Sequence, residues 1–276
     1  MKRYLYGESV KGASHERSGM PLQDSCLIQE ISDNIAILAV ADGHGSEKCP
    51  RSKSGSQIAV NTFIEVMKKY LLGYGQHEEG LTSLATFLNR EGDMRFAQDI
   101  CEEWQKRIRA SFNKNKDDSC LNDDKTVDWE KAYKLYGTTL LGMLITKGYV
   151  FCFQIGDGDI TLIDNEGVST VVETEKMLGV ETHSLSKIDA WKHSSTMLRR
   201  RDMAENTPYL YMLTTDGFAN SYPSDEGFTD ACKGYFDSIK TNGFEPVKAA
   251  MPKWLKETSE LGCGDDITAV LAYFSE

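Results

Sequence analysis

The sequence has no long hydrophobic run and no surplus of positive charge. None of its 276 residues lies in a stretch that approaches the roughly 20 apolar residues of a membrane-spanning helix. The N-terminus has no apolar segment of the length found in signal peptides. The formal net charge of −11 argues against a protein that binds the phosphate backbone of nucleic acids. We therefore expect a cytoplasmic protein that binds neither a membrane nor a nucleic acid.

Cysteine pairs with metal-binding spacing are also missing. The seven cysteines are scattered, form no C-x-x-C motif and are odd in number. This pattern suggests neither a zinc site nor a disulfide framework. Reduced thiols are expected, which agrees with a cytoplasmic location.

The composition is that of an ordinary globular protein. Hydrophobic residues make up 40% of the chain and charged residues 26%. No repeat, low-complexity tract or linker divides it, so we predict a single domain over residues 1–276.

The most informative stretch is Ile35 to Gly45, which reads I-A-I-L-A-V-A-D-G-H-G. Seven apolar residues bounded by polar neighbours predict a buried strand. The glycines that follow Asp42 predict a turn, which places a carboxylate and the imidazole of His44 at the end of the strand. An Asp-Gly pair is also typical of a hairpin turn, so this stretch alone leaves both interpretations open.

The rest of the chain shows helical and strand-like patterns. Apolar residues recur at helical spacing in five stretches, which we predict as helices: 55–72, 81–88, 93–112, 228–239 and 246–258. Short β-rich runs predict strands at 4–10, 25–30, 35–41, 138–146, 149–155, 159–163, 168–172 and 209–215, with a final strand after residue 266. The segments 12–24, 113–128 and 173–205 are predicted to be loops or irregular.

Carboxylates stand at the ends of four predicted strands. They are Asp42, Asp157 with Asp159, Asp216, and Asp265 with Asp266. A single strand end with an aspartate could be an ordinary turn. Four such strand ends, one of them beside a histidine, indicate that the carboxylates share a cleft. All-oxygen ligands favour Mg²⁺ or Mn²⁺ over Zn²⁺. Two such ions hold phosphoryl oxygens and lower the pKa of a bridging water, and His44 is suited to protonate a departing oxygen.

Other candidate ligands are less well placed. His183 and His193 have no other metal-binding residue types beside them, and both are predicted to be surface residues. The acids of segment 113–128 lack the glycine and terminal glutamate of a calcium-binding loop, so we predict a solvated loop.

The ordered motifs resemble those of the metal-dependent protein phosphatases of the type 2C class, in a bacterial-looking form. They are P-L-Q-D-S, V-A-D-G-H-G, G-T-T-L-L-G-M-L-I, I-G-D-G-D, T-T-D-G and G-D-D-I-T-A-V, and they span nearly the whole chain. The resemblance implies an α+β fold, a β-sandwich of two antiparallel sheets flanked by helices on both sides. It also implies that 173–205 takes the place of the family's flap, a variable segment beside the site.

The resemblance implies a set of metal ligands. Asp42 is expected to bridge two Mn²⁺ or Mg²⁺ ions, with the backbone carbonyl of Gly43 as a further ligand. Asp216 and Asp265 are expected to complete the ligand set of the first ion. Asp265 is ranked above Asp266 as a ligand, because Asn also occurs at the second position in the family.

Three further roles follow from the same resemblance. Asp24 is expected behind the ligands, hydrogen-bonded to metal-bound water. Asp157, together with Asp216, matches the weaker third metal of some members. His44 falls where certain members place their general acid.

The sequence departs from the family pattern near its start. Many members have Glu-Asp where this chain has Gln23-Asp24, and Gly19 stands at the position of the usual phosphate-binding arginine. We therefore expect Arg17 or His15 to bind the phosphate of the substrate.

The expected function is a serine/threonine protein phosphatase that depends on Mn²⁺ or Mg²⁺ and acts by direct attack of a metal-bridging water. The expected partners are a phosphorylated protein and a serine/threonine kinase, and the protein is expected to be a monomer. Two alternatives stay open: a non-catalytic, metal-binding pseudophosphatase that binds a partner, and a hydrolase of small phosphorylated molecules.

Overall fold

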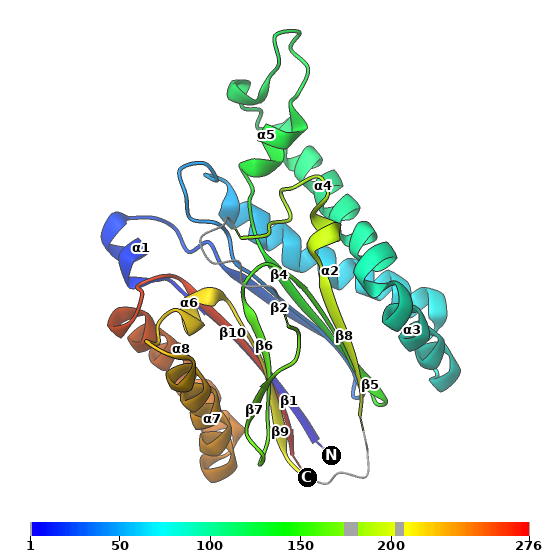
Figure 1. Cartoon of the computed structure of the whole chain (residues 1–276), viewed down its shortest axis with the longest axis vertical. Coiled ribbons are helices and arrows are strands. Elements are labelled where there is room, and N and C mark those ends of the chain that lie inside the picture. Colours follow the sequence, from blue (N-terminus) through cyan, green and yellow to red (C-terminus); the bar gives the residue numbers. More distant parts are fainter. Residues whose placement is uncertain (1, 174–181, 202–206, 276) are drawn as a thin grey trace.

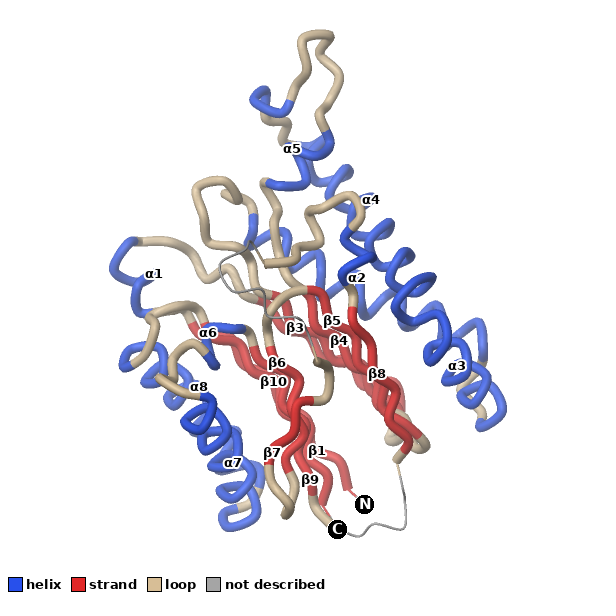
Figure 2. The backbone as a smooth tube through the Cα atoms, viewed as in Figure 1, coloured by secondary structure: helices blue, strands red, loops and turns tan. Residues whose placement is uncertain are grey.

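Two five-stranded antiparallel sheets form the centre of the protein and pack face to face (Figure 1). The structure is a computed structural model, and it describes residues 2–173, 182–201 and 207–275. Helices cover the outer face of each sheet, so the layers run helix, sheet, sheet, helix (Figure 2). The predicted α+β sandwich is confirmed.

Each sheet combines strands from distant parts of the chain. The first has the order β1 (Lys2–Val10), β10 (Ile267–Ser275), β9 (Tyr209–Thr214), β6 (Asp159–Ile163) and β7 (Val168–Thr170). The second has the order β2 (Ser25–Ser32), β3 (Ile35–Ala41), β4 (Leu140–Ile145), β5 (Tyr149–Ile155) and β8 (Ser195–Arg200).

The long helices follow the predicted stretches with extended ends. The second sheet is covered by α2 (Ser52–Tyr74), α3 (Glu78–Glu91), the π-helical turn η1 (Gly92–Phe96) and α4 (Ala97–Lys114). The first sheet is covered by α7 (Asp225–Asn242) and α8 (Phe244–Leu261). No helix in the described ranges combines the length and the apolar character that a membrane crossing requires.

Strand β3 shows why its sequence is apolar throughout. Ile37 and Ala39 belong to the core between the second sheet and its helices, whereas Leu38 and Val40 belong to the core between the two sheets. Because both faces of the strand are covered, neither can carry polar side chains. Gly142 on the neighbouring β4 lets the helices approach closely, since a Cβ atom there would lie 2.1 Å from the ring of Phe63.

Several segments predicted as loops contain regular structure. They hold the short helix α1 (Ala13–Ser18), the 3-10 turns η2 (Asp118–Cys120) and η3 (Ala190–His193), and strand β8. These elements are too short to show a clear periodic pattern, which is why the prediction of loops was wrong there. Two further short helices, α5 (Trp129–Lys134) and α6 (Asp216–Ala219), lie outside the predicted loops and were not predicted.

The segment predicted as irregular at 173–205 is only partly so. Its residues Ser195 to Arg200 form β8, which pairs with the edge of β5 from Gln154 to Tyr149. An edge strand with one exposed face has a mixed sequence and no apolar run. The stretches 174–181 and 202–206 lie outside the described residues, and much of the expected flap falls there.

Candidate active site

The acids of the second sheet lie at one end of the sandwich. Asp24 directly precedes β2 and Asp42 directly follows β3, and these antiparallel strands pair Ser25 with Ala41. The pairing therefore places the two aspartates side by side at adjacent strand ends.

The first sheet brings its acids together in the same way. Strand β9 ends at Thr214, which pairs with Ala269 near the start of β10. Asp216 lies just after β9 and Asp265 just before β10, so the two again stand at neighbouring strand ends.

These two sets of acids meet across the sandwich. The hydroxyl of Thr215 donates a hydrogen bond to Oδ2 of Asp24 over 2.8 Å. The carboxyl groups of Asp42 and Asp216 lie close enough for the charge of Asp216 to raise the pKa of Asp42. These aspartates come from motifs that are far apart in the sequence, and the fold brings them into one cluster.

Crowded negative charge makes the cluster hard to ionise. Burial raises the pKa of Asp24 to about 8, and the charge of Asp266 adds to the effect. Burial, followed by the charges of Asp24 and Asp216, raises the pKa of Asp42 well above its ordinary value. Burial and the charge of Asp157 raise the pKa of Asp216 to about 6. A nearby divalent cation would relieve this repulsion and favour the charged forms.

Asp265 and Asp266 have different surroundings although they are adjacent. The two oxygens of Asp266 accept hydrogen bonds from the backbone N–H groups of Gly12 and Gln23, each over 2.7 Å. The side chain of Asp265 is 52% exposed, and its Oδ1 accepts a hydrogen bond from the N–H of Asp266 over 2.8 Å. Asp266 therefore ties the segment before β2 to the start of β10, whereas the carboxylate of Asp265 is open to a ligand.

The two residues predicted to bind phosphate lie on α1, beside this pair. In His15, Nδ1 is 2.9 Å from Oδ1 of Asp266 and Nε2 is 3.6 Å from Oδ1 of Asp265, and both are ion-pair distances. Arg17 is exposed, and its guanidinium lies against the turn at Gly264. The imidazole is thus engaged by two carboxylates, whereas no described residue forms an ion pair with Arg17.

His44 lies beside the cluster, on the loop after β3. Its N–H donates to the carbonyl of Gly137 over 3.1 Å, and its ring leaves no room for a side chain at Gly137. The ring also borders a cavity that Thr182 lines, and Thr182 donates a hydrogen bond to Oδ2 of Asp157 over 2.6 Å. One end of this cavity is therefore close to the acids.

Sequence reasoning missed the threonines that hold the acids in place. The hydroxyl of Thr138 donates to the carbonyl of Asp42 over 2.7 Å, and the hydroxyl of Thr139 accepts from its N–H over 3.0 Å. The hydroxyl of Thr215 donates instead to the side-chain carboxylate of Asp24. The G-T-T and T-T-D-G motifs held the signal, because small hydroxyl residues next to a strand-end aspartate commonly bond to neighbouring backbone.

His183 and His193, predicted to be surface residues, lie next to each other. The rings of His183 and His193 stack with their centroids 4.0 Å apart and an angle of 10° between the planes. They are partly to well exposed, in keeping with the predicted surface positions.

The donor set of the cluster suits a hard divalent cation. Its side chains are carboxylates, and the buried Oε1 of Gln23 beside Gly45 has no hydrogen-bond partner in the described part of the chain. Even so, within residues 2–173, 182–201 and 207–275 no three His, Cys, Asp or Glu side chains stand in a geometry that holds a metal. The residues therefore fit the ion chemically, while their ligand atoms are not gathered around one point.

Comparison with known families gives one match that covers most of the chain. The family model described as protein phosphatase 2C matches residues 11–257. A search of curated proteins gives no match.

Solved structures with the same fold are distant in sequence. The serine/threonine phosphatase PstP/Ppp of Mycobacterium tuberculosis has 14% identity and a TM-score of 0.58, with 100% of each chain covered. A PstP catalytic domain in complex with two manganese ions has 15% identity and a TM-score of 0.58, with 100% of this chain and 99% of that chain covered. PppA, described as a regulatory component of T6SS in Pseudomonas aeruginosa, has 13% identity and a TM-score of 0.57, with 99% of each chain covered. At such low identity, these structures establish the fold.

Proposed function

The chain belongs to the protein phosphatase 2C family, and we propose that it is a serine/threonine protein phosphatase that requires Mn²⁺ or Mg²⁺. The observation that carries this proposal is the meeting of aspartates from both sheets at one end of the sandwich. The pKa values of Asp24, Asp42 and Asp216 are raised by burial and by neighbouring carboxylates, and a bound cation would offset this repulsion. The manganese ions of the PstP catalytic domain support the choice of metal.

Three aspartates and a backbone carbonyl form the proposed ligand set. Asp42, Asp216 and Asp265 would hold two divalent ions together with the carbonyl of Gly43, and Asp157 would contribute to a weaker third site. Bound divalent ions supply positive charge that screens the phosphate and acidifies the attacking water. Asp24, fixed by the hydroxyl of Thr215, accepts hydrogen bonds from water in the site.

The remaining steps fall to side chains beside the cluster. Water attacks phosphorus directly, and the bond from phosphorus to the seryl or threonyl oxygen breaks as His44 delivers a proton to that oxygen. Arg17 pairs with a phosphate oxygen. We assign this role to Arg17 and not to His15, because the imidazole is already within reach of Asp265 and Asp266.

The proposed substrates are phosphoproteins produced by a serine/threonine kinase, and the proposed active form is a monomer. Turnover of p-nitrophenyl phosphate and of a phosphothreonine peptide, measured with Mn²⁺ and with EDTA, tests the proposal. We expect activity with Mn²⁺, none with EDTA, and a loss of about 100-fold or more in Asp216→Asn. The matched control is Asp237→Asn, which neutralises an exposed acid that pairs with Lys233 on α7.

The other outcomes of this assay correspond to the alternatives. A folded protein that binds Mn²⁺ and hydrolyses neither substrate would be a pseudophosphatase. Hydrolysis of small phosphate esters without any turnover of phosphopeptides would indicate a small-molecule hydrolase.

A further inference from the structure

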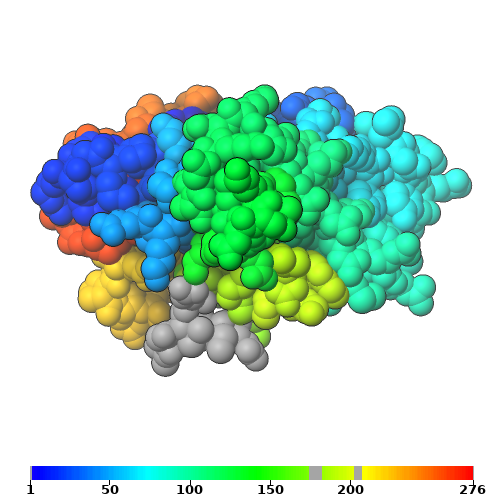
Figure 3. All heavy atoms as spheres, turned by 90° about the horizontal axis from the view of Figure 1, so that it is seen from above, coloured from blue at the N-terminus to red at the C-terminus, as the bar shows by residue number. Residues whose placement is uncertain are grey.

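A cavity of about 980 Å³ opens beside His44, and we call it the side groove. Three segments form its walls: the loop after β3, helix α5 and the stretch that leads into η3. They contribute His44, Ser46, Glu47, Lys48, Cys49, Glu130, Lys134, Thr182, Ser184, Ser186, Lys187, Ile188 and Asp189. Viewed from above, the light-blue loop and the yellow-green stretch each adjoin the green α5 region (Figure 3).

The side groove is continuous with the proposed active site. His44, the proposed acid, forms part of its wall, and Thr182 joins it to Asp157 through a hydrogen bond of 2.6 Å. If the phosphate of a substrate lies on the aspartates, the backbone of the phosphorylated residue therefore lies next to the mouth of the groove.

Hydrogen bonds hold the walls in place. The N–H of Leu185 donates to the carbonyl of Thr138 over 2.9 Å, and the N–H of Thr138 donates to the hydroxyl of Ser184 over 3.1 Å. Gln105 of α4 donates to the carbonyl of Ile188 over 3.3 Å. These bonds connect the lining of the groove to the start of β4 and to α4, so the protein's own contacts fix the shape of this wall.

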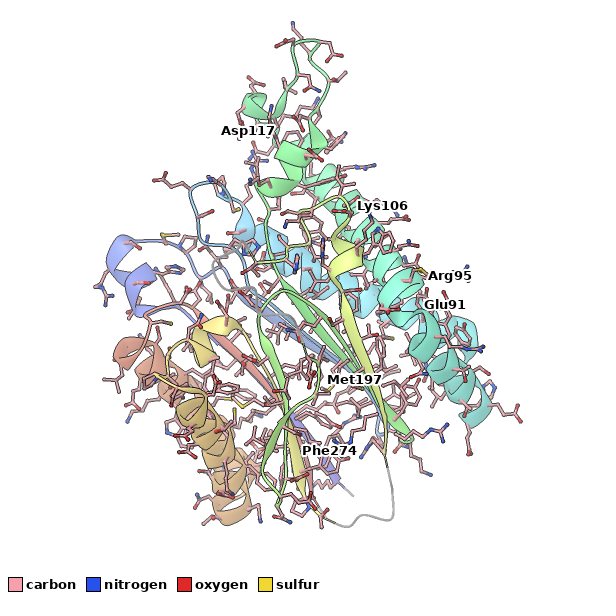
Figure 4. All side chains as sticks on the ribbon, in the orientation of Figure 1. Glu91, Arg95, Lys106, Asp117, Met197 and Phe274 are labelled. Carbon is pink, nitrogen blue, oxygen red and sulfur yellow. The ribbon has the colours of Figure 1, made fainter. Side chains whose placement is uncertain are left out.

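The opposite wall belongs to a segment that projects from the sandwich. Helix α5 follows the loop that contains Asp117, and Figure 4 shows Asp117 on this projection beyond the end of α4. The projection is anchored at its base by Arg51, which donates to the carbonyl of Asn115 over 2.7 Å and to the hydroxyl of Tyr136 over 3.0 Å.

The size and lining of the groove suit a piece of polypeptide. Its volume is at the upper end of the roughly 300–1,000 Å³ of small-ligand pockets, more than one phosphorylated side chain needs. Its three lysines are balanced by three acids, so the lining favours neither sign of charge. It also exposes one large apolar side chain, Ile188, which is 53% accessible.

We propose that the side groove binds the substrate polypeptide on one side of the phosphorylated residue and receives an apolar substrate side chain against Ile188. This inference rests on the proposed phosphatase function and adds the feature by which that site selects phosphoproteins. Lys134 of α5, which also lines the groove, contributes a second contact to the same segment.

A leucine scan tests the selection without knowledge of the substrate. The probes are phosphothreonine decapeptides of alanine in which a single leucine moves from position to position. We expect kcat/KM of the wild-type protein to peak, by about fivefold or more, for leucine at one distance and on one side of the phosphothreonine. Equal kcat/KM over the whole set would overturn the proposal.

Two variants connect this preference to the groove. In Ile188→Ala the peak should flatten, and in Lys134→Ala kcat/KM for the best peptide should fall several-fold, while p-nitrophenyl phosphate is hydrolysed as before. The matched controls are Leu72→Ala, at an apolar residue 82% accessible on α2, and Lys131→Ala, at a lysine of α5 that pairs with Asp128 outside the groove. If the controls flatten the peak equally, or if p-nitrophenyl phosphate turnover falls in parallel, the groove is not the source of selection.

A binding measurement separates this inference from the proposed function. If the wild-type protein hydrolyses nothing, the phosphatase proposal fails, and the same peptides with a fluorescent label are titrated against wild type and Ile188→Ala. A leucine-dependent affinity that is lost in Ile188→Ala supports the groove as a binding site. The absence of any leucine dependence in both measurements rejects it.

Discussion

At the scale of single residues, the aspartates are arranged against their own electrostatic preference. Asp24, Asp42 and Asp216 come close enough for each to oppose the ionisation of another. Such crowding costs folding free energy when no cation is present. Residues that serve a site in this way destabilise the protein that carries them.

Asp216→Asn should therefore stabilise the metal-free protein while it abolishes activity. The folded pKa of Asp216, about 6, lies above the ordinary 3.8, so its ionisation costs stability as pH rises through this range. In EDTA at pH 7 to 8 we expect a higher melting temperature for the variant than for wild type. The difference should disappear only well below pH 3.8, where the carboxyl is neutral in both the folded and the unfolded chain, and a variant that melts lower at neutral pH would contradict this account.

The role of His44 predicts a dependence on the leaving group. An alkoxide needs a proton to depart, whereas p-nitrophenolate is stable without one. His44→Gln should lower kcat for a phosphothreonine peptide by roughly 100-fold or more and change kcat for p-nitrophenyl phosphate far less. Equal losses on both substrates would show that the histidine does not act as the acid.

At the scale of elements, the two acids before β10 have different roles: Asp265 is a proposed metal ligand, and Asp266 connects segments of the fold. Asp266 joins the segment before β2 to β10 through two charge-assisted hydrogen bonds, to Gly12 and Gln23. The close fit requires glycine, since a Cβ atom at Gly12 would lie 2.3 Å from the backbone of Asp265. Asp266 therefore has a structural role that the adjacent Asp265 does not share.

Replacing each acid with alanine should give opposite profiles. Asp266→Ala leaves two buried N–H groups unpaired and should lower the free energy of unfolding by about 3 kcal/mol. Asp265→Ala should leave the stability of the metal-free protein nearly unchanged and weaken Mn²⁺ binding at least tenfold. Urea denaturation in EDTA and calorimetric titration with Mn²⁺ measure the two effects, and similar stability losses in both variants would refute the division.

At the scale of the whole molecule, the proposed ligands belong to different sheets. Asp42 follows a strand of the second sheet and Asp216 one of the first. An ion bound by both connects the two halves of the sandwich at one end, and it binds the folded chain alone because the unfolded chain has no such cluster.

Mn²⁺ should therefore stabilise the fold as well as activate it. At a concentration about 100 times the dissociation constant, the gain expected from mass action is roughly 2.7 kcal/mol. The melting temperature should rise with Mn²⁺ concentration, return to its starting value with EDTA, and stay constant in the double variant Asp42→Asn/Asp216→Asn. Equal stabilisation of that variant would place the ion elsewhere.

The sequence by itself predicted the fold class, which the structure confirms, and it supplied the acids that we propose as metal ligands. The apolar run of β3 and the helical stripes of α2, α4 and α7 are long enough for their period to show which faces are buried. The strand-end aspartates stood out because glycine or a second acid follows each of them. Short elements such as α1, α5 and β8 escaped prediction, since their stability comes from contacts with the rest of the molecule.

Only the tertiary structure decided how these residues work together. It separated Asp265 from Asp266, turned His15 toward that pair, and set the hydroxyls of Thr138, Thr139 and Thr215 on the acids. It also formed the side groove from three segments that are distant in the chain. Local sequence patterns report which face of an element is buried, but the direction of a side chain at a strand end depends on packing between elements that are far apart in sequence.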